Sequence, residues 1–301
     1  MKRFFVYLLV VFLLVCVLDI VNRFLCDFMY DRIPVNSELY REYNYVTNKK
    51  QADILILGAS RGVYSYNVDM ISDSLHMHCI SASNEGMSIF HQYLNLLRAC
   101  QNGSVSFVIL DLSPAQLSTD WVRNKISVLY PFYWKDKNVR EIVRETKGWY
   151  SDIILCSSFI QYNSTFIDYI HKGYFMPALD NDGYIPIEYT GKSFVFHKTD
   201  NDKTKIEVDT LGIKYLDKIV EYCKNKDIAL VICNSPRLNN VECFDTFLTD
   251  YTNRRHVPFW NYSKYAPVVM DNRLFVDPLH INCKGTDIFT EEIVRKIKEN
   301  I

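Results

Sequence analysis

Three polar residues from two distant parts of the chain could act together as a serine nucleophile, its base and a carboxylate that orients the base. Ser60 ends the tripeptide Gly58-Ala59-Ser60, and Asp277 precedes His280 by three residues near the end of the chain. A serine hydroxyl becomes an effective nucleophile when a neighbouring base takes its proton, and histidine is the usual base. An aspartate that accepts the Nδ1–H of the imidazole leaves Nε2 free for that proton. We therefore predict catalysis by Ser60, His280 and Asp277, with acyl transfer or ester hydrolysis as the chemistry.

Ser60 also has a purely structural explanation, because serine often caps the helix that follows it. The run between Asp53 and Gly58 is apolar without alternation and ends in a tight turn, as expected for a buried strand of a parallel sheet. In such sheets ligands bind beyond the carboxyl ends of the strands, where the next helix presents unpaired N–H groups. The first motif alone favours the cap, whereas the pair Asp277 and His280 favours the nucleophile.

A second strand-to-helix turn could supply donors for the oxyanion that forms during attack on a carbonyl. The segment Ser81-Ala-Ser-Asn84-Glu85-Gly86 follows a short strand predicted near residues 77–80 and precedes a helix. Because Gly86 has no side chain, its N–H could approach a substrate closely and act together with the N–H of Ser60. We predict Gly86 as an oxyanion donor at this turn.

These residues can meet only if a parallel sheet brings the ends of its strands to one edge. Helices with apolar residues three or four positions apart separate short apolar runs, which predict strands near residues 53–57, 77–80, 105–110, 228–233 and 257–260. This alternation implies a parallel sheet that is covered on both faces. We predict an α/β fold, a flavodoxin-like three-layer α/β/α sandwich. Asp111 would end the third strand at the same edge, where it could contact substrate or cap a turn.

The alternation of strands and helices is interrupted at about residues 115–205, a segment rich in Tyr, Phe and Trp. We predict an aromatic-rich insertion that lies over the sheet edge and selects substrate, since aromatic faces suit sugar rings or acyl chains. A local aromatic core explains the composition equally well. Asp180-Asn-Asp182-Gly183 resembles a calcium loop but lacks the downstream glutamate, so we predict a turn there and no metal site.

The first residues predict an N-terminal transmembrane helix. Phe4 to Leu18 carries no charge, and the apolar pattern resumes after Asp19. This uncharged stretch is short for a bilayer, which needs ~20 residues, but tilt and the following turn can extend the span. No small-residue cleavage site follows, so an uncleaved signal anchor is favoured over a cleaved signal peptide or a buried helix of a soluble protein. Lys2 and Arg3 then predict a single-pass protein of the cytoplasmic membrane with its catalytic domain outside the cytoplasm.

Composition limits the partners and cofactors. The 301 residues carry a formal net charge of -1 with no basic cluster, which argues against a nucleic-acid partner. The nine cysteines form no Cys-x-x-Cys pair, so no metal or redox motif is predicted, and one or two disulfides stay open for an exported domain. We divide the chain into an anchor at residues 1–26, a stalk at residues 27–50 and a catalytic domain at residues 51–301 that contains the insertion.

Taken in order along the chain, these motifs resemble those of the SGNH (GDSL-like) hydrolase superfamily. The resemblance covers residues 51–114 and 209–301 and rests on the motifs Gly-Ala-Ser60, Asn84-Glu85-Gly86 and Asp277-x-x-His280. It implies the nucleophile, base and orienting carboxylate named above, an oxyanion hole made by the N–H groups of Ser60 and Gly86, and no cofactor. Three further residues in or beside these motifs are expected to bind substrate: Arg61, Asp111 and Asn282.

One position departs from the pattern of that superfamily. Its third motif usually supplies an asparagine side chain to the oxyanion hole after the third strand, where this chain has Asp111. A carboxylate repels an oxyanion, so either Asn84 takes that place or the hole has two donors. Losing one donor typically lowers the rate by ~10² to 10³.

The N-terminal segment and the Asp-x-x-His-x-Asn-x-x-Gly tail most resemble the envelope members of the superfamily, which accompany polysaccharide O-acetylation or D-alanylation of teichoic acids. The resemblance implies a membrane-anchored serine acyltransferase or acylesterase that acts on an envelope polysaccharide. Its partners would be the glycan, an acyl donor and a multispanning membrane acyltransferase. Two alternatives stay open: a catalytically degenerate glycan-binding or scaffold protein of an envelope acylation system, and a secreted lipase.

Overall fold

The computed structural model divides the chain into two compact units. Unit 1 comprises Met1–Tyr43 and Ile126–Ala178, and unit 2 comprises Asn44–Lys125 and Leu179–Ile301. The residues that the structure describes are 1–32, 51–118, 125–163, 165–171, 175, 182–191, 207–239 and 241–300. Most of the predicted stalk, parts of the predicted insertion and Asp180 therefore lie outside the described residues.

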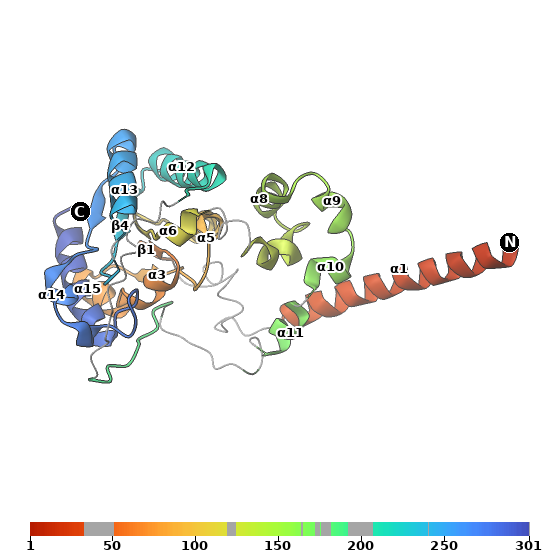
Figure 1. Cartoon of the computed structure of the whole chain (residues 1–301), viewed down its shortest axis with the longest axis horizontal. Coiled ribbons are helices and arrows are strands. Elements are labelled where there is room, and N and C mark those ends of the chain that lie inside the picture. The colour runs from red at the N-terminus through yellow and green to blue at the C-terminus, as the bar shows by residue number, and fades with distance from the viewer. Residues whose placement is uncertain are drawn as a thin grey trace. The chain divides into compact units, whose positions relative to one another are not determined.

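Unit 2 is organised around a parallel sheet (Figure 1), which has five strands within the described residues. The strands are β1 (Ile54–Leu57), β2 (Cys79–Ser81), β3 (Phe107–Asp111), β4 (Ala229–Asn234) and β5 (Phe259–Asn261). They lie in the order β2-β1-β3-β4-β5, and each neighbouring pair is parallel. This is the flavodoxin-like order, in which the winding reverses between β1 and β3. The predicted α/β fold is confirmed.

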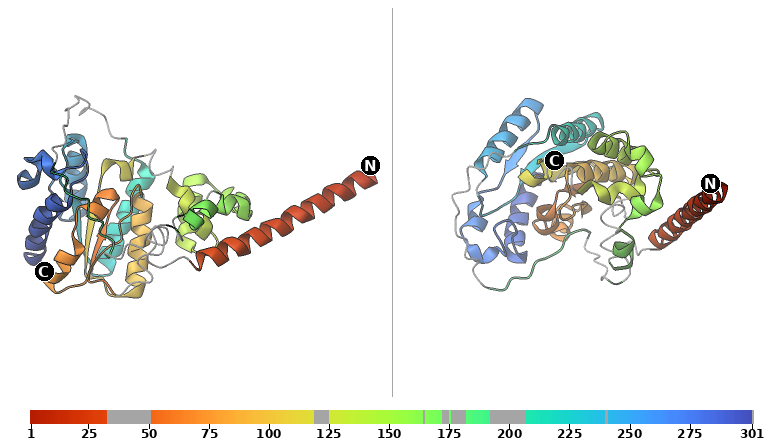
Figure 2. Two further views of the ribbon diagram at one scale, coloured as in Figure 1. Left: turned by 90° about the horizontal axis from the view of Figure 1, so that it is seen from below. Right: turned by 45° about the vertical axis from the view of Figure 1, so that its right-hand side comes forward.

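Helices cover both faces of the sheet (Figure 2). One face carries α4 (Val68–Leu75) and α15 (Cys283–Lys298), and the other carries α5 (Ile89–Asn102) and α12 (Thr210–Asn225). Within the described residues, the remaining helices of unit 2 are α3 (Ser60–Tyr64), α6 (Pro114–Leu117), α13 (Glu242–Arg255), α14 (Ala266–Val269) and η5 (Asn272–Leu274). All residues of β1 are buried. Because both faces are covered, β1 is apolar without alternation, as the sequence analysis predicted.

Unit 1 is helical and has an aromatic core. Its elements are α1 (Lys2–Tyr30), η2 (Lys125–Phe132), α8 (Lys137–Lys147), α9 (Ser151–Ile154), α10 (Ser158–Tyr162) and α11 (Thr165–Ile170). Tyr133, Tyr162 and Tyr169 are buried together with aliphatic residues such as Ile142. Aromatic residues in the middle of the predicted insertion thus pack in a local core. A role of the insertion in substrate selection stays a prediction.

The helix α1 is long and apolar enough to cross a membrane. Its most apolar 18-residue window has a mean hydropathy of 3.0, and none of that window is buried. The helix continues to Tyr30, four residues beyond the predicted end of the anchor at residue 26. This exposure fits a signal anchor or a signal sequence and does not fit the buried core helix of a soluble protein.

None of the nine cysteines is in a disulfide. Four of them are buried, Cys26, Cys79, Cys223 and Cys233, and the others are partly or fully exposed. Burial raises the pKa of the Cys223 thiol to about 12. These four buried cysteines therefore pack as small apolar groups.

Gly62 marks a close approach between α3 and the loop after β2. A Cβ at Gly62 would lie 2.8 Å from Ser83 Cβ and closer still to the Ser83 hydroxyl. We expect Gly62→Ala to lower the free energy of unfolding by about 1–3 kcal/mol, as overpacking does. Ser83→Gly in the same chain should restore most of that loss, measured by urea unfolding of the detergent-solubilised full chain. An effect of Gly62→Ala that Ser83→Gly leaves unchanged would contradict this packing.

Candidate active site

Ser60 is the first residue of α3 and follows the turn that ends β1. Gln92 of α5, which is fully buried, holds this turn. The N–H of Gly58 donates to Gln92 Oε1 at 3.1 Å, and Gln92 Nε2 donates to the Gly58 carbonyl at 2.6 Å. No sequence motif singles out Gln92, yet its amide fixes the backbone two residues before the candidate nucleophile.

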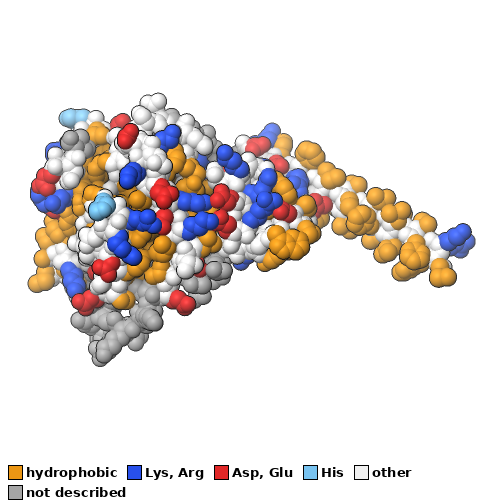
Figure 3. Space-filling model, turned by 90° about the horizontal axis from the view of Figure 1, so that it is seen from above, with side chains coloured by type: hydrophobic (Ala, Val, Ile, Leu, Met, Phe, Trp, Pro, Cys, Tyr) orange, Lys and Arg blue, Asp and Glu red, His pale blue; other side chains and the backbone are white. Residues whose placement is uncertain are grey.

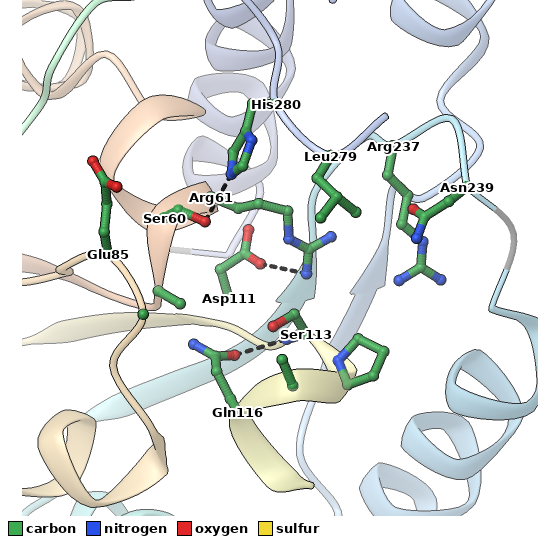
Figure 4. A pocket seen from close by; sticks show the side chains of 14 residues that line it. Ser60, Arg61, Glu85, Asp111, Ser113, Gln116, Arg237, Asn239, Leu279 and His280 are labelled. Atoms are coloured by element: carbon green, nitrogen blue, oxygen red, sulfur yellow. Dashed lines mark hydrogen bonds and ion pairs between the residues drawn. The ribbon is translucent and has the colours of Figure 1, made fainter. Parts of the chain in front are cut away.

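His280 reaches Ser60 from the loop that precedes α15 (Figure 4), and Asp277 lies three residues before His280 in that loop. His280 Nε2 lies 2.7 Å from Ser60 Oγ, and His280 Nδ1 lies 2.7 Å from Asp277 Oδ2. Asp277 Oδ1 accepts the backbone N–H groups of Leu279 at 2.7 Å and His280 at 3.0 Å. The structure thus brings the three predicted residues together in the order that a serine nucleophile, its base and an orienting carboxylate require.

Hydrogen bonding keeps the Asp277 carboxylate ionised. Burial opposes the charge, but hydrogen bonds from the His280 side chain and from the N–H of Leu279 outweigh it and hold the pKa of Asp277 below its ordinary value. An ionised carboxylate at Nδ1 favours the tautomer that carries its proton there. It would also stabilise an imidazolium formed if His280 takes a proton from Ser60.

A cavity of about 440 Å³ opens at Ser60 and His280. Gly86 lines this cavity and has a φ of 68°, a conformation that favours glycine. Asn84 is not among the described residues that line it. Its Oδ1 accepts the N–H of Glu85 at 2.8 Å, and its buried Nδ2 has no partner within the described residues. Of the two predicted oxyanion candidates at this turn, Gly86 is therefore the one at the cavity wall.

Arg61 and Asp111 also line the cavity, and they pair with each other. Arg61 Nη2 lies 2.9 Å from Asp111 Oδ1, and the two side chains are 5% and 1% exposed. The contact is an ion pair and not a hydrogen bond, because Oδ1 accepts none of suitable geometry within the described residues. Tyr66 donates to Asp111 Oδ2 at 2.7 Å, and Arg61 also donates to Asn234 Oδ1 at 2.9 Å. The charge of Asp111 is thus neutralised within the protein.

Asn282 is not among the described residues that line the cavity. It caps α15, where its Oδ1 accepts the N–H of Gly285 at 3.3 Å. Its Nδ2 donates to the carbonyl of Arg273 at 2.7 Å. The predicted substrate contact of Asn282 stays a prediction, and its observed partners belong to the segments on either side of His280.

Gln116 of α6 is a cavity residue that the sequence analysis did not name. Its Oε1 accepts the N–H of Ser113 at 2.7 Å (Figure 4). Its Nε2 is buried and has no partner within the part of the chain described. The spacing Ser113-Pro-Ala-Gln116 has the Ser-x-x-Gln pattern typical of a helix start, and this signal could have placed the residue at the sheet edge.

Comparisons with known proteins give only distant similarities. No family model and no curated protein matches the sequence. The chain is similar to a GDSL-like lipase from Bacteroides thetaiotaomicron VPI-5482, with 10% identity, coverage of 87% of this chain and 98% of that one, and a TM-score of 0.43. A Bacteroides fragilis NCTC 9343 protein described as an acylhydrolase gives 11% identity, 87% and 96% coverage and a TM-score of 0.42. The acetyl xylan esterase AlAXEase gives 11% identity, 82% and 99% coverage and a TM-score of 0.40. These values are too low to assign a family, so the function rests on the geometry of the site.

Removal of Arg61 would leave the buried Asp111 carboxylate without its counterion. We expect Arg61→Met to lower the free energy of unfolding by about 3–5 kcal/mol, as breaking a buried ion pair does. Asp111→Asn in the same chain should recover much of that loss, because no unpaired charge is then left. Urea unfolding of the full chain in detergent measures both effects, and an Arg61→Met chain as stable as the parent would contradict a buried ion pair.

Proposed function

We propose that the chain is a membrane-anchored serine acylesterase or O-acyltransferase of the SGNH type that acts on an envelope polysaccharide. The observation that carries this proposal is the hydrogen-bonded series Ser60, His280 and Asp277 at the wall of a cavity. The series lies beyond the carboxyl end of β1, where α/β folds bind ligands. Because all three side chains are present and connected, an enzyme is favoured over a catalytically degenerate binding protein.

The proposed reaction has two halves. Ser60 Oγ attacks the acyl carbonyl while His280 Nε2 takes its proton, and Asp277 stabilises the resulting imidazolium. His280 then returns the proton to the leaving group, and an acyl ester remains on Ser60. A sugar hydroxyl or water attacks this ester and gives its proton to His280. The acyl group leaves as a new ester or a free acid, and the Ser60 hydroxyl is restored.

Donors for the oxyanion would come from both sides of the cavity. The N–H groups of Ser60 and Gly86 are the first two, as the resemblance implies. Asp111 cannot replace the family's asparagine, because it is a carboxylate already paired with Arg61. Gln116 offers an unpartnered side-chain amide at the cavity, so we assign the third donor to its Nε2.

The helix α1 supports the membrane location in this proposal. Its 18-residue apolar window is exposed and follows Lys2 and Arg3, which favour a cytoplasmic N-terminus. The remainder of the chain would then lie outside the cytoplasm. The envelope glycan, the acyl donor and a multispanning membrane acyltransferase enter the proposal as partners through the resemblance alone.

A fluorophosphonate probe tests the nucleophile directly. We expect the detergent-solubilised full chain to gain one adduct by intact mass, and Ser60→Ala to gain none. In His280→Ala, labelling should slow by roughly 10³-fold or more, because the hydroxyl loses its base. Ser104→Ala changes an exposed serine before β3 and should label like the parent. Labelling that persists in Ser60→Ala would contradict the mechanism, and a folded parent without an adduct would favour the degenerate binding protein.

The role of Gln116 is tested by Gln116→Glu. This change keeps an acceptor for the Ser113 N–H and replaces the amide donor with an oxygen. We expect kcat for hydrolysis of an aryl acetate to fall by ~10² to 10³ with KM little changed, as for loss of one oxyanion donor. The urea unfolding curve serves as the control for folding: it should keep one cooperative transition, shifted to lower urea because a carboxylate replaces the buried amide. An unchanged kcat in a folded Gln116→Glu chain would exclude Gln116 from the oxyanion hole.

A further inference from the structure

Within unit 1, the polar residues of α1 beyond Leu18 are bonded to the start of α10. Asp19 Oδ1 accepts the N–H of Ser158 at 2.7 Å, the N–H of Phe159 at 3.3 Å and the hydroxyl of Ser157 at 2.7 Å. The Ser158 hydroxyl donates to the Asp19 carbonyl at 2.6 Å. Asn22 Nδ2 donates to that hydroxyl at 2.9 Å. Asp19, the first charged residue after the apolar stretch, therefore has its hydrogen-bond partners at the start of α10.

The same arrangement extends to the next charge along α1. Arg23 Nη2 donates to the carbonyl of Cys156 at 2.6 Å. On the other sides of the helix, Ile20, Val21 and Phe24 are 54%, 55% and 71% exposed. The outer surface of α1 thus stays apolar through the level of Arg23. The polar groups of α1 at that level face α10 and the residues just before it.

This arrangement bears on the length of the membrane span. The uncharged stretch Phe4–Leu18 would be ~22 Å long as a helix, whereas the hydrocarbon core of a bilayer is ~30 Å thick. An ionised Asp or Arg without partners is costly at that depth. Because unit 1 provides partners for Asp19 and Arg23, the span can continue to about Phe24, and part of unit 1 then reaches the membrane surface.

The part of unit 1 next to these bonds is apolar and exposed. We name as the apolar edge the residues Ile153 and Ile154 of α9 and Phe159 and Ile160 of α10, which are 67%, 40%, 48% and 45% exposed. α9 and α10 lie along the side of unit 1 from which α1 projects (Figure 1). Figure 3 shows hydrophobic side chains on unit 1 beside the base of α1. The exposed apolar surface of α1 therefore continues onto α9 and α10.

We propose that the apolar edge of unit 1 is seated in the interfacial region of the bilayer that α1 spans, and this inference rests on the proposed membrane anchoring. Lipid is the occupant that the geometry favours, because the edge is continuous with the exposed surface of α1 and lies at the end of its apolar stretch. Aromatic and aliphatic side chains beside satisfied polar groups suit the boundary between headgroups and acyl chains. α9 and α10 would thus lie against one side of α1 at the membrane surface.

A tryptophan reporter tests the position of the apolar edge. The full chain carrying Phe159→Trp is reconstituted in phosphatidylcholine and phosphatidylglycerol vesicles whose acyl chains are brominated near the headgroup. We expect the emission added by this substitution to fall about twofold or more relative to unbrominated vesicles, because the ring lies at the interface. Met270→Trp is the matched control, since Met270 is an exposed apolar residue of unit 2 at 82%, and its added emission should not change.

Flotation of the vesicles separates this inference from the anchoring on which it rests. If the chain floats with the vesicles but the Phe159→Trp emission is not quenched, the anchoring stands and the seating of unit 1 is overturned, which leaves a protein partner for the edge. If the chain does not float, the anchoring itself fails. Ile153→Glu in the Phe159→Trp chain should leave flotation unchanged and reduce the quenching, and quenching that Ile153→Glu does not alter would also overturn the proposal.

Discussion

The hydrogen bond between His280 Nε2 and Ser60 Oγ is the constraint on which the rest of unit 2 depends, because it joins residues 220 positions apart in the chain. Each residue is held by hydrogen bonds of its own segment. Gln92 clamps the turn before Ser60, and the carboxylate of Asp277 accepts two N–H groups of the loop that carries His280. The parallel sheet then brings the turn before Ser60 and the loop that carries His280 to the same edge. The geometry at the site therefore depends on short-range bonds in the loop of His280, on the contact of α5 with the turn before Ser60, and on the strand order that brings the two segments together.

The ion pair between Arg61 and Asp111 also helps to hold Ser60 at this edge of the sheet. Arg61 follows the nucleophile directly, and Asp111 ends β3, so the pair ties the start of α3 to the neighbouring strand. The guanidinium also bonds Asn234 at the end of β4. These contacts cross the point between β1 and β3 where the winding of the sheet reverses, which is where such folds open a crevice. The carboxylate of Asp111 would be unfavourable beside an oxyanion, but its ion pair with Arg61 helps to fix the position of Ser60.

The strands and the meeting of Ser60, His280 and Asp277 could be predicted because their signals are local. A strand covered on both faces is an apolar run, and an aspartate three residues before a histidine can reach its ring across one turn. The roles of Gln92 and Gln116 carried no such local signal. The Ser113-x-x-Gln116 spacing indicates only a helix start, and what a glutamine on a helix does depends on what the helix packs against. Asn282 shows that even a residue within a motif can make contacts that its type does not reveal. It lies in the tail motif, but its amide partners are backbone groups, and residue type does not distinguish such a cap from a substrate contact.

The aromatic residues of the insertion show why composition left two explanations open. Tyr162 donates to Asp27 of α1, and the ring of Tyr169 lies 5.5 Å from that of Tyr30, so these side chains join the insertion to the first helix. Phe159 lies on the same short segment as Tyr162 but is half exposed. The difference comes from which side of α10 faces α1, and α1 precedes the insertion by about a hundred residues. Since the charges of α1 beyond Leu18 are partnered by this segment, the first helix and the insertion have to be treated as one structural element.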